Sequence, residues 1–207
     1  MSDRVPCKEC GAIILPTTAA ATGGVCMACK QGIRANLERA KEFYRKQRLP
    51  NPERDYWSAL VNRIYHTEAG YGGIAPVERV YYLCCVVNGE IYNGGLHQFY
   101  SNSAGDRYSE TLDALQQLGA THARRIVIRS CEFLFPGMDA PPTDRQERCA
   151  ILPWWPDAPT DPPVTWADEL ACLDKEYLAE PDGLGAILTR YGIDHGLFTE
   201  PPADNAQ

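Results

Sequence analysis

Apolar residues recur at helical intervals along most of the chain after residue 54. In residues 55–67, for example, Tyr56, Leu60 and Ile64 fall on one face of a helix. The next apolar segment begins at Pro76, a residue favoured in the first turn of a helix, and it is apolar on nearly every side. We expect this segment to form the central buried helix, although its β-branched residues also permit a strand.

Similar patterns predict further helices toward the C-terminus. Between them, the stretch from about residue 136 to residue 163 holds eight of the 16 prolines, so we expect a largely irregular loop with a short helix inside it. The fold class predicted is mainly α, a compact multi-helix domain. The expected helices cover residues 107–119, 121–135, about 145–150, 165–180 and 183–192.

Four cysteines near the N-terminus have the spacing of a metal site. Cys7 and Cys10 form CKEC, Cys26 and Cys29 form CMAC, and fifteen residues separate the two pairs. Two thiolates on a tight turn reach one ion, and a second such turn completes a tetrahedron. We predict a structural Zn²⁺ ribbon or knuckle, with the apolar residues 14–18 as strand.

Two other interpretations of these cysteines carry less weight. Four unrelated free thiols do not explain the spacing, and a thioredoxin-like redox site lacks a βαβ pattern around it. Four protein ligands leave no open position for a substrate, so the site is structural and not catalytic. A segment of about 30 residues buries too little core to fold alone, so the metal supplies folding energy.

The domain organisation follows from these patterns. We predict a zinc-binding module at residues 1–32, a basic helix or linker at 33–52, a helical domain at 53–200 and a disordered tail at 201–207. The composition, 44% hydrophobic and 23% charged, is that of a globular protein. No apolar run matches a membrane span and the N-terminus lacks a secretory pattern, so we expect a cytoplasmic protein without membrane contact.

Charge is distributed unevenly along the chain, whose net charge is −7. Residues 1–52 carry nine Lys or Arg and four Asp or Glu, whereas residues 131–207 carry four and fifteen. A basic end and an acidic end say more about partners than about the fold. The acidic excess either serves solubility alone or forms a binding surface.

Residues 93–106 read NGGLHQFYSNSAGD, and a helix with the pattern E-x-x-x-A-L-x-x-L-G-A follows. This string resembles the signature of a bacterial domain family of largely unknown function that includes a DNA-mimic protein. The resemblance covers about residues 55–135, and the four-cysteine module is an addition to it. The matching positions are Asn93, Gly94, Gly95, Gln98, Phe99, Asn102, Ser103, Gly105, Glu110, Ala114, Leu115, Gly119 and Ala120.

The signature is better explained as a helix junction than as an active site. Gly94 and Gly95 are expected to break the central helix, after which Phe99 returns to the core. The amides of Asn93, Gln98 and Asn102 are expected to hydrogen-bond loose backbone groups at the breaks. Asp106 is placed to cap the next helix.

Catalysis is the weaker alternative for this string. An enzyme would use His97 as a base, yet no acid or nucleophile accompanies it at a recognisable spacing. Neither a GxSxG motif, nor an HExxH motif, nor a phosphate loop is present. We therefore expect a protein that is not an enzyme.

The family resemblance implies an acidic helical protein that binds a DNA-reading surface. The partner would be a protein with a basic or DNA-binding surface, such as a transcription regulator or a toxin. The sequence also permits a homodimer. Mimicry requires exposed carboxylates spaced like phosphates along one surface. The candidates are Asp168, Glu169, Asp174, Glu176, Glu180 and Asp182, with Asp157 and Asp161 as weaker ones.

The alternative function is nucleic-acid binding by the basic N-terminal third. A zinc module followed by a basic helix is a common signature of nucleic-acid-binding proteins. Glu38 and Glu42 interrupt the basic cluster, and a basic helix face is often only solvated. Direct binding to nucleic acid is therefore the second choice.

Overall fold

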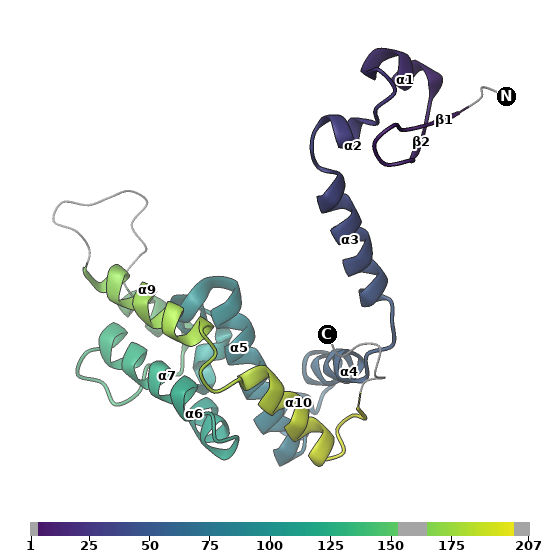
Figure 1. Ribbon diagram of the computed structural model, residues 1–207. Coiled ribbons are helices and arrows are strands. Elements are labelled where there is room, and N and C mark those ends of the chain that lie inside the picture. Colours follow the sequence, from purple (N-terminus) through teal and green to yellow (C-terminus); the bar gives the residue numbers. More distant parts are fainter. Residues whose placement is uncertain (1–3, 153–164, 201–207) are drawn as a thin grey trace. The chain divides into compact units, whose positions relative to one another are not determined.

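The computed structural model describes residues 4–152 and 165–200, and the chain divides into two compact units (Figure 1). The N-terminal unit lies within residues 1–51, and the helical unit spans residues 52–200. Each unit has its own elements and its own packing. The expected tail at 201–207 lies outside the described residues.

The N-terminal unit combines a short hairpin with helices. Strands β1 (Val5–Pro6) and β2 (Ile13–Ile14) pair antiparallel, and helices α1 (Pro16–Thr22), α2 (Met27–Lys30) and α3 (Arg34–Gln47) follow. The α3 helix confirms the expected basic helix. Residues 16–18, which we expected as strand, belong to α1, because proline at the first helical position and a run of alanines favour a helix.

The N-terminal unit has almost no hydrophobic core. Among its described residues, only Cys7 and Cys26 have buried side chains. Large apolar side chains stay exposed instead, including Ile13 and Met27. Apolar burial of this extent cannot offset the entropy of ordering the backbone, so another source of stability is required.

The helical unit consists mainly of helices, as the hydrophobic pattern predicts. The expected short helix within the proline-rich stretch is present at Arg145–Ile151, and residues 153–163 of that stretch lie outside the described residues. The first helix begins at Pro52, three residues before the predicted start, with Glu53 and Asp55 in its first turn. The elements are α4 (Pro52–His66), η1 (Gly70–Gly73), α5 (Pro76–Ser101), η2 (Ser103–Arg107), α6 (Tyr108–Gln117), α7 (Thr121–Leu134), α8 (Arg145–Ile151), α9 (Thr165–Leu178) and α10 (Leu184–Asp194).

Helix α5 is the centre of this unit and contacts α6, α8, α9, α10 and η2 (Figure 1). It confirms the expected buried helix and excludes the alternative strand. Cys84, Val87, Ile91 and Leu96 on α5 are at most 1% exposed. Because neighbours surround α5, apolar residues occur on nearly all of its faces, which explains the continuous apolar run in the sequence.

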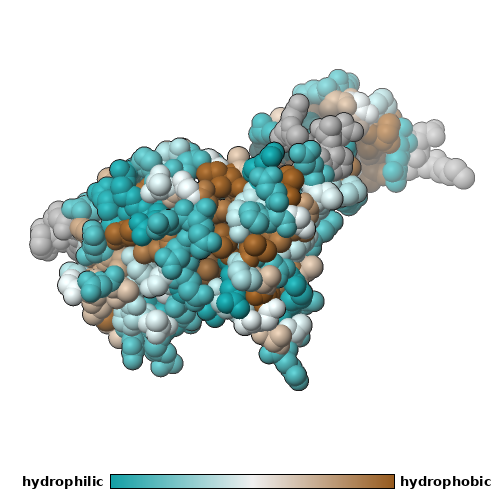
Figure 2. All heavy atoms as spheres, turned by 90° about the horizontal axis from the view of Figure 1, so that it is seen from below, coloured by the Kyte–Doolittle hydropathy of each residue, from teal (hydrophilic) through white to brown (hydrophobic). Residues whose placement is uncertain are grey.

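The helices around α5 complete one hydrophobic core. Leu60 of α4, Leu115 of α6, Ile126 of α7 and Leu170 of α9 are fully buried against it. Burial of each such side chain stabilises the fold by about 2 kcal/mol. Hydrophobic side chains reach the surface only in patches on the face that Figure 2 shows, among mainly hydrophilic neighbours. Within the described residues, none of the helices has the length and apolarity that a membrane span requires.

Helix α5 is broken at Gly94 and Gly95, as the sequence predicts. Gly95 has φ +76°, a conformation that disfavours every residue with a Cβ atom, and neither glycine has helical dihedral angles. Phe99 and Tyr100 follow the break and are buried. The Tyr100 hydroxyl donates to the Val127 carbonyl oxygen at 2.7 Å, which fixes the second half of α5 to α7.

A pair of glycine substitutions on α5 tests this break. We expect Gly95→Ala to lower the free energy of unfolding by at least about 2 kcal/mol, because a Cβ atom there is strained and lies 2.5 Å from the Asp174 carboxylate. Gly89→Ala is the control: its Cβ atom would meet nothing, and it should stabilise the helix by about 0.5–1 kcal/mol. Urea unfolding of both variants measures the difference. Equal effects would contradict the assigned role of Gly95.

Candidate metal centre and the signature junction

The four predicted cysteines form one cluster. The sulfur atoms of Cys7, Cys10, Cys26 and Cys29 all lie within 4.8 Å of one another, and the Cys10 and Cys26 sulfurs are 3.7 Å apart. Tetrahedral coordination with metal–sulfur bonds of about 2.3 Å requires sulfur–sulfur distances of about 3.8 Å. The side chains therefore fit a single metal ion.

Tight turns aim these sulfurs at one point. After Cys7 the chain turns back, with the Gly11 amide donating to the Cys7 carbonyl oxygen at 2.9 Å. Cys26 occupies the N-cap position of α2, and its sulfur accepts a hydrogen bond from the Cys29 amide at 3.3 Å. The Cys26 amide donates in turn to the Cys7 sulfur at 3.1 Å. Amide donors directed at sulfur favour thiolates, the form that binds metal.

The electrostatics of the cluster differ between its members. The amide of Cys26 outweighs desolvation and lowers the pKa of Cys7 to about 6. Desolvation and the neighbouring sulfurs raise the pKa of Cys29, because negative charge is unfavourable in such a crowded group. Arg34 of α3 brings a positive charge close to Cys10. Desolvation lowers the pKa of Arg34, but nearby negative groups, the Cys10 sulfur first among them, together outweigh this effect and raise it. A bound cation would relieve the remaining repulsion between the sulfurs.

The donor set defines the kind of metal the site would hold. Four thiolates suit a soft or borderline ion such as zinc, and all four tetrahedral positions are occupied by protein. The site is therefore closed, as expected for a structural centre. Of the other cysteines, Cys84 and Cys85 lie in the helical unit, where burial raises the pKa of both thiols.

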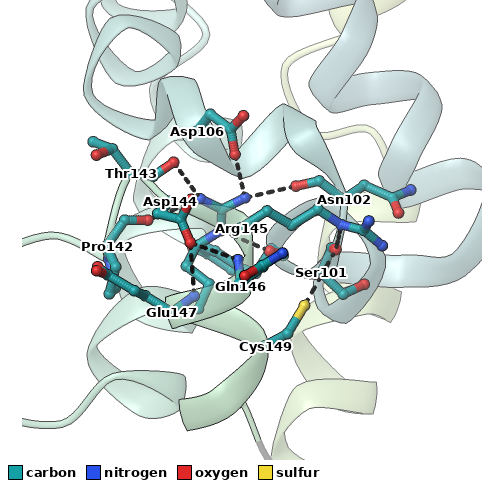
Figure 3. Close-up of polar contacts among 12 residues, drawn as sticks. Ser101, Asn102, Asp106, Pro142, Thr143, Asp144, Arg145, Gln146, Glu147 and Cys149 are labelled. Atoms are coloured by element: carbon teal, nitrogen blue, oxygen red, sulfur yellow. Dashed lines mark hydrogen bonds and ion pairs between the residues drawn. The ribbon is translucent and has the colours of Figure 1, made fainter.

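The centre of the signature region is the guanidinium of Arg148, on α8. Arg148 is fully buried, and all five of its N–H groups donate hydrogen bonds. Four go to the carbonyl oxygens of Tyr100, Asn102, Pro142 and Thr143 at 2.8–2.9 Å. The fifth goes to the carboxylate of Asp106. Figure 3 labels Asn102, Asp106, Pro142 and Thr143 among the acceptors. Arg148 thus joins the end of α5, η2 and the segment before α8.

The expectation that Asp106 caps the next helix is wrong. Asp106 lies inside η2, Arg107 occupies the N-cap position of α6, and no side chain caps that end. The Asp106 carboxylate accepts from Arg148 instead, because a buried guanidinium needs a negative partner. Gly105 gives Arg148 its space, since a Cβ atom at position 105 would lie 2.8 Å from the Arg148 Nε atom.

The expected role of the amides is also wrong. Gln98 and Asn102 do not bond loose backbone groups; their side-chain amides donate to the Glu90 carboxylate at 2.7 and 2.8 Å. Glu90 lies in the first half of α5, so these bonds hold its two halves together across the break. The close approach of the Gln98 side chain also explains Gly94, where a Cβ atom would overlap the Gln98 Oε1 atom.

A carboxylate from α9 satisfies the backbone at the break. The Leu96 amide donates to Asp174 Oδ1 at 2.8 Å, and Gly95 leaves room for that carboxylate. Desolvation raises the pKa of Asp174, against the opposing effects of the Leu96 amide and of His97. His97, whose ring stacks near the Trp166 ring at 6.4 Å, therefore belongs to this junction.

Two signature residues have no role in the junction. Within the described residues, the side chains of Asn93 and Ser103 have no hydrogen-bond partner, and Asn93 is exposed. Both line a pocket of about 490 Å³ next to α5. The helix junction therefore does not explain why Asn93 and Ser103 belong to the signature.

The predicted acidic residues divide by their surroundings. Asp174 and Asp182 accept from the backbone amides of Leu96 and Ala123, so they cap helix starts and do not form a free surface. Glu176 pairs with Arg125 and Arg129 of α7. Glu180 is exposed and accepts from the Tyr92 hydroxyl.

Asp168 and Glu169 are exposed on the first turns of α9. Within the described part of the chain, neither makes an ion pair or a hydrogen bond through its side chain. They border a groove of about 500 Å³ between α7 and α9, together with Glu132 and Glu176. Asp157 and Asp161 lie outside the described residues.

The fold and the site define a mainly helical domain with a bent central helix, preceded by a four-cysteine centre. Residues 72–195 match the protein family described as DMP19-like protein, which is more than half of the 207 residues. The chain therefore belongs to this family, and the predicted resemblance is confirmed at the level of the family. No curated protein and no solved structure matches the chain.

Arg148 and Glu90 are the important residues that the sequence did not reveal. Arg148 lies on a short helix within the proline-rich stretch, and its position 48 residues after Tyr100 gives no local signal. Glu90 lies among the apolar residues of α5. Its charge within that apolar run was the only feature of the sequence that indicated a structural role. A half-buried charge such as that of Glu90 favours a hydrogen-bonding partner, but the sequence does not say which one.

Two arginines on α8 allow a matched test of the junction. Lysine at position 148 has three donors in place of five, so Arg148→Lys should leave buried carbonyl groups unpaired and lower the free energy of unfolding by about 3 kcal/mol. Arg145 is exposed and its Nε atom donates to the Ser101 carbonyl oxygen, so Arg145→Lys should change stability by less than about 1 kcal/mol. Thermal and urea unfolding provide the comparison. A tolerated Arg148→Lys would contradict the role of this network.

Proposed function

We propose that this protein is a non-catalytic binding protein whose helical unit occupies a basic, DNA-binding surface of a partner protein. The partner would be a transcription regulator or a toxin that acts on nucleic acid. The observation that carries this proposal is the groove between α7 and α9. It is lined by the carboxylates of Glu132, Asp168, Glu169 and Glu176, against one arginine, Arg129.

The proposal has support from chemistry and from the family. The family resemblance includes a DNA mimic, and carboxylates gathered along a groove attract the lysines and arginines that otherwise contact phosphates. Electrostatic attraction of this kind speeds association and depends on salt. Binding alone requires no nucleophile and no general base.

The structure narrows the surface that can act in this way. Asp174 and Asp182 are excluded, because each is engaged with a helix amide. Glu176 is partly neutralised by the arginines of α7, which leaves Asp168, Glu169 and Glu132 as the groove carboxylates that are most available. The binding surface is thus smaller than the charge count of residues 131–207 suggests.

We further propose that the four-cysteine cluster holds a structural Zn²⁺. Its sulfur geometry and its closed donor set support this choice. Among the described residues of the N-terminal unit, only Cys7 and Cys26 of this cluster are buried, which supports a large contribution of the metal to folding. The ion would cross-link the β1–β2 hairpin to α2 and so order the residues between them.

Nucleic-acid binding by the N-terminal unit is the second candidate. Its basic charge favours contact with phosphates, and α3 presents exposed Lys and Arg side chains. However, Arg34 and Lys41 pair with Glu38, and Arg45 pairs with Glu42, so part of this charge is already balanced within the helix. We therefore prefer the acidic groove.

Charge removal in the groove tests the first proposal. Asp168→Asn with Glu169→Asn should reduce capture of basic DNA-binding proteins from a lysate at least about tenfold, because two desolvated ion pairs are lost. The control variant Asp113→Asn with Asp139→Asn removes the same charge from exposed positions outside the groove. Quantitative mass spectrometry of the captured proteins is the measurement, and added duplex DNA should compete.

Equal capture by both double variants would refute the groove as the binding surface. Retention of the unaltered protein on a DNA column, lost at high salt, would favour the second candidate instead. Retention that depends on Lys46 and Arg48 would locate that binding at the C-terminal end of α3.

Metal analysis tests the proposed zinc centre. Purified protein should contain about one zinc per chain, and Cys7→Ser with Cys26→Ser should remove it, because two thiolates cannot hold the ion alone. Cys172→Ser is the control, since Cys172 is an exposed cysteine of the helical unit. A chelator should make residues 4–47 sensitive to protease and leave the helical unit resistant. Full metal content in the double variant would contradict the site.

A further inference from the structure

A second pocket of the helical unit has an aromatic wall and a polar end. Its volume is about 490 Å³, within the usual range of ligand pockets, and it lies among α4, η1, α5, η2 and α6. It is separate from the acidic groove, with which it shares no lining residue. Of the residues that accept hydrogen bonds from Arg148, only Asp106 also lines this pocket.

The aromatic wall is formed by side chains from three elements. Trp57 of α4 stacks on Tyr82 of α5, with ring centroids 5.8 Å apart and an angle of 22° between the rings. The hydroxyls of Tyr65 and Tyr82 are 3.0 Å apart, and Tyr71 of η1 packs against the Tyr82 ring. Tyr65 is 62% exposed, so a ligand can reach the wall from solvent.

The polar end contains acceptors that the fold leaves available. Asn93 and Ser103, the two signature residues without a structural role, line it beside Glu90 and Asp106. Asp106 is paired with Arg148, but no cation in the described residues pairs with Glu90. Glu90 receives only the neutral amides of Gln98 and Asn102, so its negative charge is not balanced within the pocket.

The chain itself shows which group this wall can hold. The guanidinium of Arg107 lies over the Tyr71 ring, 3.5 Å from its centroid, and pairs with Glu110 at 2.8 Å. A guanidinium between an aromatic face and a carboxylate is thus already present at the edge of the pocket. The half-buried Trp57 and the exposed Tyr65 line the same pocket as the Glu90 carboxylate, which has no ion-pair partner among the described residues.

We propose that this pocket binds an arginine side chain of the partner protein. The inference rests on the proposed function, because it supplies a specific contact for a partner with a basic surface. The planar guanidinium would lie against the aromatic wall and donate to Glu90, Asn93 and Ser103. Lysine fits less well, since its ammonium has three donors in place of five and lacks the planar face that stacks on a ring.

The signature then has two functions in one string. Most of its residues build the junction, whereas Asn93 and Ser103 provide the polar contacts of the pocket. Since the junction fixes the end of α5 and η2, it also fixes the two positions from which these side chains reach the ligand. The groove attracts a basic partner, and the pocket distinguishes arginine from other residues.

Blocked tripeptides test this pocket directly on the whole protein. We expect acetyl-Gly-Arg-Gly-amide to shift the NMR signal of the Trp57 indole N–H during titration. The same peptide with citrulline, which has the shape of arginine without its charge, should bind at least about threefold more weakly, and so should the lysine peptide. Tyr65→Ala and Asn93→Ala should weaken arginine binding by a similar factor. Tyr44→Ala, an equally exposed tyrosine in the N-terminal unit, should not.

The outcomes separate this inference from the proposed function. An unmoved Trp57 signal, or equal binding of citrulline, overturns the arginine pocket, even if the groove variant Asp168→Asn with Glu169→Asn still loses its partner. A Trp57 response that Tyr65→Ala weakens supports the pocket, even if the groove variant keeps full partner capture. Circular dichroism of Tyr65→Ala and Asn93→Ala should match the unaltered protein, since both side chains are exposed.

Discussion

The buried guanidinium of Arg148 holds together the region on which the rest of the helical unit depends. Four of its donors bind the backbone carbonyl oxygens of residues 100, 102, 142 and 143, and the fifth binds the carboxylate of Asp106. A buried charge without these partners would be strongly unfavourable, so the surrounding segments have few alternatives. The end of α5, the η2 turn and the approach to α8 therefore form one rigid arrangement, and Gly105 is the residue that makes room for it.

The sequence predicted the helices and the break in α5 because these depend on local properties. Apolar spacing, a proline at the start of α5 and two adjacent glycines are all visible within a few residues. The cluster of four cysteines was predictable for the same reason, since the spacing within each pair is short. The acceptors of Gln98 and Asn102, and the partner of Asp106, were predicted wrongly. Their partners are selected by the packing of helices, which single-residue patterns do not contain.

The same limit applies to the acidic residues. A count of carboxylates in residues 131–207 treats them as equivalent, but the fold uses Asp174 and Asp182 to satisfy the first amides of other helices. Those positions favour a negative charge because helix N-termini carry free N–H groups and a positive partial charge. Under the proposed function, only the carboxylates that cap no helix are available to a partner.

The capping of α5 by α9 also has a consequence for how the chain is made. The Leu96 amide donates to Asp174, which follows it in the sequence by 78 residues. The Ala123 amide donates to Asp182, which follows it by 59 residues. During synthesis the first half of α5 can form early. The Leu96 amide, just beyond Gly95, lacks its native acceptor until α9 has been synthesised. The helical unit therefore completes its folding only after α9 has been synthesised. A chain truncated before α9 would lack the carboxylate that caps the break in α5.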